Sequence, residues 1–293
     1  MKISVLILTQ NRQEELIHCV LSLRRELANL LEIIILDNGS NPPVLVTDLA
    51  LISKVKLLRS AKNLGVAKGR NVLAQEARGD LLWFLDDDAV LETQEVCQLI
   101  KSYFRNVSLG VVSFKVINSL TGEEEVRCIP DRRKDLTNRD LTTSYFVGCS
   151  FVIRRKAFFD AGGFWEGFFY SCEELDLSYR LLELKYTLIR SSLLKVKHAF
   201  LPSPRRTSFW IYFNSRNRFW AALRNLPMRY VVSQSLLWWG YTGWVALGEK
   251  KPRLWFSALR DSIQGAPDVY LKRKVISHET LQNILSLGGR AWY

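Results

Sequence analysis

The segment GDLLWFLDDDAVLE, residues 79–92, decides the fold class of this chain of 293 residues. Its apolar run, LLWFL, has the length of a strand that is buried on both faces. Three consecutive acids, Asp86, Asp87 and Asp88, follow this run directly. Because their mutual repulsion costs stability, we expect these acids either to form a solvated turn or to bind a cation.

Short apolar runs of the same kind recur through the first two-thirds of the chain and alternate with stretches of helical spacing. The predicted strands are 3–9, 32–38, 54–59, 80–86, 109–117 and 144–154. The predicted helices are 12–28, 66–78 and 173–185. This alternation predicts right-handed crossovers and an α/β fold with a mostly parallel, Rossmann-like sheet flanked by helices. Ligands of such sheets bind beyond the carboxyl ends of the strands, where the acids lie.

Two segments differ from this pattern. Residues 118–143 are polar, charged and turn-rich, which is typical of an insertion or a loop near the site. From residue 207 to residue 293 the chain is basic and aromatic, and it holds most of the nine tryptophans there. This change of composition predicts a C-terminal helical region.

Charge and cysteine content limit the partners and the compartment. The 41 lysines and arginines exceed the 29 acids, and the net charge of +12 indicates an anionic partner such as a nucleic acid, an acidic lipid or a phosphorylated substrate. The five cysteines form no CxxC pair and are odd in number, which argues against a zinc site or a disulfide framework. Because the first apolar run is also too short for a signal peptide, we expect a cytoplasmic protein.

The spacing of the acids suits a divalent metal. Asp86 and Asp88 can direct oxygens at one Mg²⁺ or Mn²⁺, which takes its other ligands from water and from substrate phosphates. A second predicted strand ends in LDNGS, residues 36–40, so two acidic strand ends can meet over one ligand. The alternative, a solvated acidic turn, stays open at this point.

Six motifs in order carry a resemblance to a known family. They are SVLILTQNR (4–12), IIILDNGS (33–40), NLGVAKGRN (63–71), GDLLWFLDDDAVL (79–91), GCSFVIRRKAFFDAGGF (148–164) and EELDLSYRL (173–181). Over roughly residues 1–220 the chain resembles the family 2 glycosyltransferases with the GT-A fold, and among them the bacterial rhamnosyltransferase-like members. The resemblance implies a GT-A catalytic domain over 1–206, with a nucleotide-binding half at about 1–117 and an acceptor half at about 144–206. The helical region 207–293 follows this domain.

The resemblance also implies which residues form the site. The nucleotide-sugar donor would contact Thr9, Asn11, Arg12, Asp37, Asn63, Gly65, Arg70, Asp86 and Asp87. The metal, Mg²⁺ or Mn²⁺, would be bound by Asp88, Asp86 and His198. The acceptor side would include Gly148, Cys149, Trp165 and Asp176. From the residues alone, simple turns at 37–39 and 63–65, a structural histidine and an aromatic core cluster stay open as alternatives.

The predicted helix at 173–185 begins with the acids Glu173 and Glu174. In the family that the chain resembles, the second acid of this pair is the general base, which assigns that role to Glu174 and leaves Glu173 as the alternative. An ionised carboxylate can take the proton from an acceptor hydroxyl. Acids in a first helical turn are also favoured by the helix dipole, so a purely structural role stays open.

Together with these residues, the resemblance implies an inverting, metal-dependent glycosyltransferase. It would move a sugar from a nucleoside-diphosphate-sugar, with UDP or dTDP as the expected nucleotide, to a hydroxyl of a glycan or lipid-linked acceptor. A nucleotidyltransferase of similar fold is an alternative, although LTQNRQEEL, residues 8–16, lacks the glycine-rich basic loop of that class. A basic nucleic-acid-binding protein is another, because arginines and aromatics interleave over 205–224. It leaves the three acids unexplained, so we expect no nucleic-acid partner.

The nineteen residues 230–248 contain no charged side chain. Their length would allow a bilayer span if they form a helix. Polar residues such as Gln234, together with tryptophans in mid-segment, favour an interfacial or core helix instead. The stretch before it is rich in arginine and aromatic residues, which predicts peripheral attachment to the anionic inner face of the cytoplasmic membrane.

Overall fold

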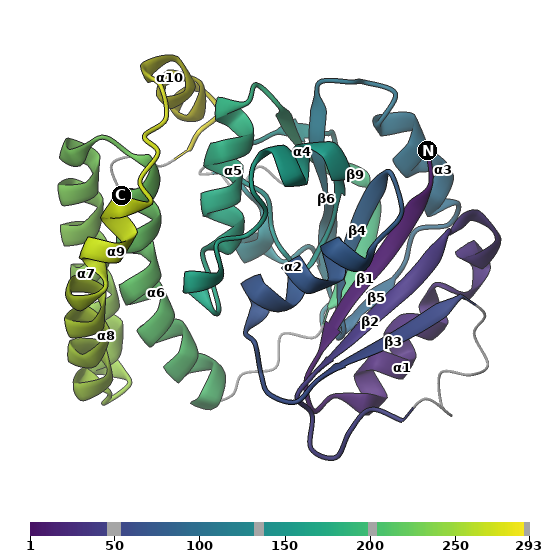
Figure 1. Ribbon diagram of the computed structural model, residues 1–293, viewed down its shortest axis with the longest axis horizontal. Helices are drawn as coiled ribbons and strands as arrows, with labels where there is room; N and C mark the ends of the chain where they lie inside the picture. The colour runs from purple at the N-terminus through teal and green to yellow at the C-terminus, as the bar shows by residue number, and fades with distance from the viewer. Residues whose placement is uncertain (46–53, 132–137, 199–203, 290–293) are drawn as a thin grey trace.

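The computed structural model describes residues 1–45, 54–131, 138–198 and 204–289. Figure 1 shows a central sheet with helices on both faces, followed by a group of helices at one end of the molecule. The predicted α/β fold with a sheet flanked by helices is confirmed. All five cysteines are free, and four of them are buried.

Within the described residues the sheet has nine strands, and eight of them follow the order β3-β2-β1-β4-β8-β6-β9-β5. Their bounds are β1 Ile3–Thr9, β2 Glu32–Asn38, β3 Val55–Ser60, β4 Leu81–Asp86, β5 Ala89–Leu91, β6 Leu109–Asn118, β7 Leu141–Thr142, β8 Ser150–Arg154 and β9 Thr187–His198. The first four strands in this order are parallel, as predicted. Beyond β4 the sheet is mixed, because β8 runs antiparallel to both β4 and β6 while β6 and β9 are parallel. The prediction of a mostly parallel sheet therefore holds for the half from β3 to β4 and not for the other half.

Two strands of the mixed half are too short for a sequence pattern to reveal. Strand β5 has three residues and pairs with β9, and β7 has two residues and also pairs with β9. The strand predicted at 144–154 is also shorter than expected, since only Ser150–Arg154 is extended in the sheet. The carbonyl of Gly148 accepts a hydrogen bond from the Arg70 guanidinium instead of from a neighbouring strand.

Helices cover both faces of the sheet, which explains why its strands are apolar throughout. Their bounds are α1 Gln13–Ser22, α2 Val66–Glu76, α3 Val96–Tyr103, α4 Arg155–Asp160 and α5 Glu173–Glu183, with 3₁₀ turns at Arg24–Asn29, Val126–Cys128 and Glu166–Phe168. Val5 and Ile7 of β1 belong to the core that includes α1 and α3. Leu6 between them belongs to the opposite core, which includes α2, α4 and α5. This is the alternation expected of a strand that is buried on both sides.

The segment 118–143, which we interpret as an insertion or loop, contributes to the sheet in its described parts. β6 continues to Asn118, and β7 lies at 141–142. Glu124 forms ion pairs with Arg190 of β9 and with Lys115 of β6, the latter at 3.0 Å. Residues 132–137 lie outside the described residues.

The C-terminal part of the described chain is helical, as expected. Its helices are α6 Pro204–Asn225, α7 Met228–Gly248, α8 Pro252–Gln264, α9 Ala266–Leu271 and α10 His278–Ser286. In Figure 1, α6 lies between α5 and the pair α7 and α8. The predicted domain boundary at 206/207 falls inside α6 and stays a prediction. Within the described residues, no helix combines the length and apolar character needed to cross a bilayer.

The sheet order reverses between β1 and β4, and this reversal positions the site. Strands β1, β2 and β4 are parallel and therefore end at the same edge of the sheet. The register aligns Thr9 with Asp37 on one side of β1 and Leu8 with Asp86 on the other. Such a reversal leaves a crevice beyond the strand ends in open α/β sheets, where ligands bind.

Candidate active site

The three acids lie where β4 ends. Asp86 is the last residue of β4, and Asp87 and Asp88 form the two-residue turn into β5. The sequence left open a solvated acidic turn at this position. The structure differs from it, because the side chains of Asp87 and Asp88 are only 7% and 10% exposed. Burying charged carboxylates is costly unless cations accompany them, so their partners determine what the turn can do.

Three cationic or potentially cationic groups surround Asp88. Its Oδ2 accepts hydrogen bonds from Arg12 Nη1 at 2.6 Å and from Arg206 Nη2 at 3.2 Å. Its Oδ1 lies 2.9 Å from His198 Nε2. Burial alone would raise the pKa of Asp88, but the hydrogen bond from His198 and the charges of His198, Arg12 and Arg206 lower it to about 2. Asp88 is therefore ionised and directed at positive charge.

The two neighbouring acids, Asp86 and Asp87, have raised pKa values, in contrast to Asp88. Asp87 Oδ1 accepts a hydrogen bond from Arg12 Nη1 at 3.0 Å, yet burial raises the pKa of Asp87 to about 7. Burial also raises the pKa of Asp86, against the attraction of Arg70. A cation bound at this turn would favour the ionised form of both acids.

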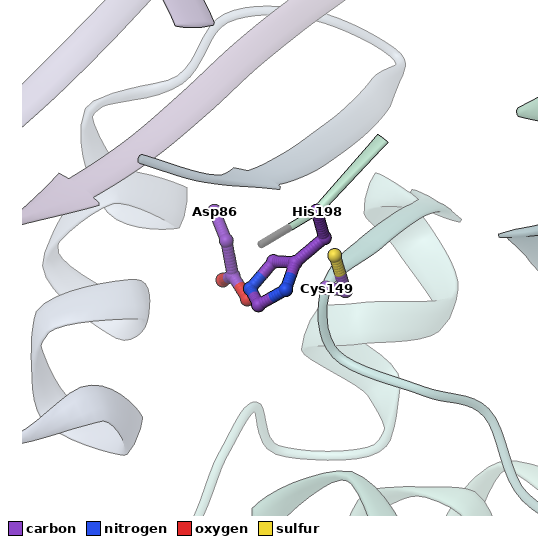
Figure 2. Close-up of side chains that lie close together, drawn as sticks. All are labelled: Asp86, Cys149 and His198. Atoms are coloured by element: carbon purple, nitrogen blue, oxygen red, sulfur yellow. The ribbon is translucent and has the colours of Figure 1, made fainter. Parts of the chain in front are cut away.

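Figure 2 shows the Asp86 carboxylate facing the ring of His198, with the sulfur of Cys149 beside the same ring. One ligand atom from each of these three residues lies within 4.8 Å of the others. Burial raises the pKa of the Cys149 thiol well above its usual value, so this side chain remains neutral. His198 is the last residue of β9 and pairs with Ala89 of β5, which places its ring over the acidic turn.

Arg70 connects the acidic turn to the start of α5. Its guanidinium donates to Asp86 Oδ1 at 3.0 Å and to Glu174 Oε1 at 2.7 Å, while Glu173 Oε1 lies 3.6 Å away. The rings of Phe151 and Phe164 lie 5.7 and 5.8 Å from this buried guanidinium. One rigid, planar cation thus fixes the distance between two groups of carboxylates.

Glu173 and Glu174 are adjacent in sequence but differ in environment. The Glu173 side chain is 3% exposed, and its Oε2 is buried without a hydrogen-bond partner among the described residues. Burial and the charge of Glu174 raise the pKa of Glu173 to about 8. Glu174 is 18% exposed and is oriented by Arg70. Of the two acids, Glu174 has the access that a general base requires.

The loop that leads into α5 has a strained backbone. Phe169, Ser171 and Cys172 have φ values of 59°, 68° and 71°, a region that residues other than glycine rarely adopt. Asn217 of α6 is buried and donates through Nδ2 to the carbonyls of Phe168, Tyr170 and Ser171 at 2.7–3.0 Å. A helix of the C-terminal region therefore holds the loop that positions Glu174.

Two residues predicted at the nucleotide side, Asn11 and Asn63, take part in a polar network across the ends of β1 and β2. Asn63 donates to Gln10 Oε1 at 2.9 Å and accepts from Asn38 Nδ2 at 3.0 Å. The Asn11 amide donates to Ser40 Oγ at 2.9 Å, and Asn11 Oδ1 accepts from the Asn41 amide at 2.7 Å. These contacts connect the segments at the ends of β1, β2 and β3 into one edge.

Gly65 shows why that edge needs a glycine. Its φ is +80°, and a Cβ there would lie 2.5 Å from the Phe169 carbonyl oxygen.

Thr9 and Asp37 are almost fully buried, each 1% exposed. Asp37 accepts hydrogen bonds from the amides of Ser40 and Val44, so the structure shows it stabilising its own turn. Nucleotide contact by these residues stays a prediction.

Comparison with known proteins decides the family. A sequence profile of glycosyl transferase family 2 matches residues 4–160, which is more than half of the chain. The chain belongs to glycosyl transferase family 2. This confirms the family resemblance drawn from the six motifs, whereas the finer rhamnosyltransferase-like placement stays a prediction.

Two relatives show how much of this family 2 chain is shared with known proteins. An uncharacterised protein of Haemophilus influenzae is 32% identical over 169 residues, which are 55% of this chain and 91% of the relative. The uncharacterised glycosyltransferase YfnE of Bacillus subtilis is 30% identical over 172 residues, 52% of this chain. This chain spans only 43% of the length of YfnE.

Solved structures share the fold at low identity. The S. aureus TarS fragment 1–349 in complex with UDP-GlcNAc has a TM-score of 0.61 at 16% identity, with 98% of this chain and 89% of that chain covered. The mannosyltransferase PcManGT from Pyrobaculum calidifontis, in complex with GDP-Man and Mn²⁺, has a TM-score of 0.60 at 13% identity. That alignment covers 98% of this chain and 84% of PcManGT. These likenesses confirm the GT-A fold.

Two residues predicted on the acceptor side have other roles in this family 2 structure. Asp176 is fully buried and is bound by Arg180 at 2.5 Å, Arg224 at 2.8 Å and Asn225 at 2.7 Å. With no exposed surface it does not face an acceptor, and that prediction is wrong. Trp165 packs against the rings of Phe168 and Trp220 and under the guanidinium of Arg224. The aromatic-core alternative describes Trp165 better.

Sequence reasoning missed two residues of α6 that reach the site, Arg206 and Asn217. The arginine and aromatic stretch that contains them predicts, from sequence alone, an exposed surface for a membrane or a nucleic acid. Much of it packs internally, since the guanidiniums of Arg216 and Arg218 lie 4.2 and 3.9 Å from the ring centres of Trp220 and Trp238. The pattern therefore needs no nucleic acid to explain it.

Gly148 provides a test of how tightly Glu174 is positioned. A Cβ at residue 148 would lie 1.8 Å from Glu174 Oε1 and 3.1 Å from Arg70 Nη1. In Gly148→Ala the Glu174 carboxylate must move away from the added methyl group. Because a catalytic group that is out of position loses much of its effect, we expect turnover to fall roughly 10–100-fold. The end of a flexible side chain moves at little cost in folding free energy, so the melting temperature should change little.

The matched control is Gly240→Ala, because a Cβ at residue 240 would meet, apart from the backbone of its own helix α7, no atom of the described residues within 4 Å. Initial rates of sugar transfer and thermal melts on both variants check the expectation. Wild-type turnover in Gly148→Ala would show that the Glu174 position in this structure is not the active one.

The raised pKa of Glu173 predicts a pH dependence of stability. Between about pH 5 and pH 8 the folded state keeps the proton on Glu173 while the unfolded chain, with a pKa near 4.5, releases it. The folded state then binds more protons, so this residue makes the free energy of unfolding fall as pH rises through that range. Glu173→Gln removes the effect, and we expect it to match wild type at pH 5 and to exceed it at pH 8 by on the order of 1–3 kcal/mol.

Urea unfolding at the two pH values measures this difference. Glu15→Gln serves as the control, because Glu15 is exposed on α1. A constant difference between wild type and Glu173→Gln at pH 5 and pH 8 would contradict a raised pKa at Glu173.

Proposed function

We propose that this chain transfers a sugar, with inversion, from a nucleoside-diphosphate-sugar to a hydroxyl of a glycan or lipid-linked acceptor. The observation that carries the proposal is the Arg70 bridge between Asp86 and Glu174. It holds an acidic turn suited to a metal and a diphosphate beside a carboxylate suited to an acceptor hydroxyl. Family 2 membership and the shared fold support the same conclusion.

The residues at the turn fit a Mg²⁺ or Mn²⁺ ion. Asp88 and Asp86 supply hard carboxylate oxygens, and His198 supplies a nitrogen that Mn²⁺ accepts. Burial raises the pKa of Asp86 and of Asp87, and a bound cation would favour the ionised form of both acids. When bound, the metal would stabilise the negative charge that develops on the departing nucleoside diphosphate. The neutral thiol of Cys149 is a poor ligand for either ion.

The chain's own residues supply the rest of the chemistry. Arg12 and Arg206, which pair with Asp88 in this structure, lie where their guanidiniums can also bind the donor diphosphate. Glu174 takes the proton from the acceptor hydroxyl as this oxygen attacks the anomeric carbon from the face opposite the diphosphate. Arg70 holds the Glu174 carboxylate in place during this step. The configuration at the anomeric carbon is thereby inverted.

For the donor we propose a UDP- or dTDP-sugar, including a rhamnosyl donor. TarS in the structure named above holds UDP-GlcNAc, and PcManGT holds GDP-Man, so proteins of this fold bind different nucleotides. We propose a cytoplasmic location, where such donors are available and where free, buried cysteines stay reduced.

Incubation with UDP-, dTDP- and GDP-sugars, Mn²⁺ and glycan acceptors tests the proposal. Release of nucleoside diphosphate gives the rate, and NMR of the product gives the anomeric configuration. We expect release with one nucleotide class and a product anomer opposite to that of the donor. Retention of configuration would contradict the role of Glu174. Release of pyrophosphate instead of a sugar product would favour the nucleotidyltransferase alternative.

A further inference from the structure

Helix α7 has its polar and apolar sides reversed relative to an ordinary surface helix. It carries no charged residue after Arg229. Its polar side chains Gln234, Ser235 and Thr242 are buried, and Thr242 accepts a hydrogen bond from Trp255 of α8 at 3.1 Å. An ordinary surface helix buries its apolar side and exposes its polar side, whereas α7 buries these polar residues and is exposed on its other side.

The other side of α7 exposes large apolar residues. They are Val232, Leu236, Leu237, Tyr241, Trp244 and Leu247, exposed by 48–72%. We call these six residues the α7 apolar face. Val232, Leu236, Trp244 and Leu247 follow helical spacing, so they form one stripe along the helix. Tyr241 contacts the rings of both Trp238 and Trp244, which extends the stripe into an aromatic surface.

The rest of the described surface has no comparable concentration. More than half of the exposed large apolar side chains follow residue 227, and those before it are scattered singly along the chain. Single exposed apolar residues are normal on soluble proteins, whereas a contiguous apolar surface indicates a binding partner.

Basic residues border the α7 apolar face. Arg229 precedes it, Lys250 and Lys251 follow it, and α8 exposes Phe256 between Arg253 and Arg260. From residue 228 to residue 275 there are eight lysines and arginines but only three acids. Apolar and aromatic side chains flanked by cations match the surface of a bilayer that contains anionic lipids.

We propose that the α7 apolar face docks on the surface of an anionic lipid bilayer. The helix lies in the plane of the interface, with Leu236, Trp244 and Leu247 at the boundary between headgroups and acyl chains. The flanking lysines and arginines contact lipid phosphates. A second copy of the chain fits the face less well, because a symmetric contact would bring the two basic borders toward each other.

In Figure 1, α6 separates α7 from the sheet and lies against α5, whose first residues are Glu173 and Glu174. Docking through α7 would therefore hold the site at a fixed distance from the membrane without covering it. The proposal concerns an interaction surface and does not depend on the sugar-transfer reaction.

Vesicle flotation of the full chain tests this surface. We expect binding to phosphatidylcholine vesicles with about one-third phosphatidylglycerol, weaker binding at high salt, and little binding to phosphatidylcholine alone. In the triple variant Leu236→Ser, Trp244→Ser, Leu247→Ser the partition coefficient should fall at least about tenfold. These side chains are exposed by 63%, 72% and 67%, so their replacement should leave the melting temperature and nucleotide binding unchanged.

A matched control replaces three apolar residues of similar exposure outside the C-terminal region. Val107→Ser, Leu120→Ser, Leu193→Ser changes side chains that are 79%, 68% and 55% exposed. This control should float like wild type. Equal flotation of both triple variants would overturn the proposal. The absence of wild-type binding to anionic vesicles would overturn it as well. A wild-type dimer that the α7 variant converts to monomers, without any vesicle binding, would assign the face to a second copy.

Discussion

Replacing Glu174 by glutamine is expected to lower the turnover of sugar transfer by roughly 10²–10⁴-fold while leaving the affinity for the nucleoside diphosphate nearly unchanged. The amide oxygen of glutamine can still accept the hydrogen bond that Arg70 Nη1 gives at 2.7 Å, so the site should keep its shape. What is lost is the ability to take a proton from the acceptor. Initial rates and calorimetric titration of the nucleotide measure the two effects separately.

Glu173→Gln is the matched control on the neighbouring residue. Because the pKa of Glu173 is raised and its side chain is buried, it is protonated at neutral pH, and glutamine is a close replacement. We expect turnover within about threefold of wild type. Loss of turnover in Glu173→Gln alone would move the base by one residue. Normal turnover in both variants would remove the start of α5 from the mechanism.

Asp88→Asn is expected to weaken Mn²⁺-dependent binding of the nucleoside diphosphate by about 100-fold, because a neutral amide replaces a charged ligand. The structure adds an effect on stability. The pKa of Asp88 is lowered to about 2, so its charge contributes to folding at all pH values above about 4 and loses that contribution as pH falls toward 2. Asparagine is uncharged at every pH, so Arg12 and Arg206 lose their ion pairs with the carboxylate of residue 88. We therefore expect a loss on the order of 1–2 kcal/mol at neutral pH.

Asp80→Asn is the control for this variant, since Asp80 lies just before β4, at the opposite end of the strand, and is exposed. Calorimetric titration with and without Mn²⁺, together with urea unfolding at pH 7, tests both effects. Full metal-dependent binding in Asp88→Asn would show that the acidic turn is only structural. Greater stability than wild type would show that repulsion among the three acids dominates over their cations.

The sequence alone was sufficient for the parallel half of the sheet and for the acidic turn. Strands such as β1 alternate between two cores, so they are apolar throughout and easily recognised. The turn acids follow β4 directly, and the end of a parallel strand is where ligands bind. Their position in the chain therefore predicts their position in space.

The cations around Asp88 could not be found in this way. Arg206 is 118 residues away from Asp88 in sequence and reaches it only because α6 begins beside the sheet. Sequence showed three acids that repel one another, and the structure shows that Arg12, Arg206 and His198 compensate Asp88. Long-range contacts of single side chains leave no local pattern.

The wrong assignment of Asp176 had a local signal. On a helix, residues two positions apart point to nearly opposite sides, so Asp176 and Glu174 cannot share one face of α5. Asp176 instead faces α6, where Arg224 and Asn225 bind it. Helical geometry, applied to the motif residue by residue, would have separated the base from the structural acid.

The central claim is that the acidic turn binds a metal together with a nucleoside diphosphate, and a thermal-shift titration tests it most directly. UDP, dTDP and GDP are added to wild type with and without Mn²⁺, each at about 100 times the expected dissociation constant. The account predicts a Mn²⁺-dependent rise in melting temperature with UDP or dTDP, corresponding to about 2.7 kcal/mol of added stability, that is absent in Asp88→Asn. No shift with any nucleotide, or a shift that is the same without metal and in Asp88→Asn, would contradict it.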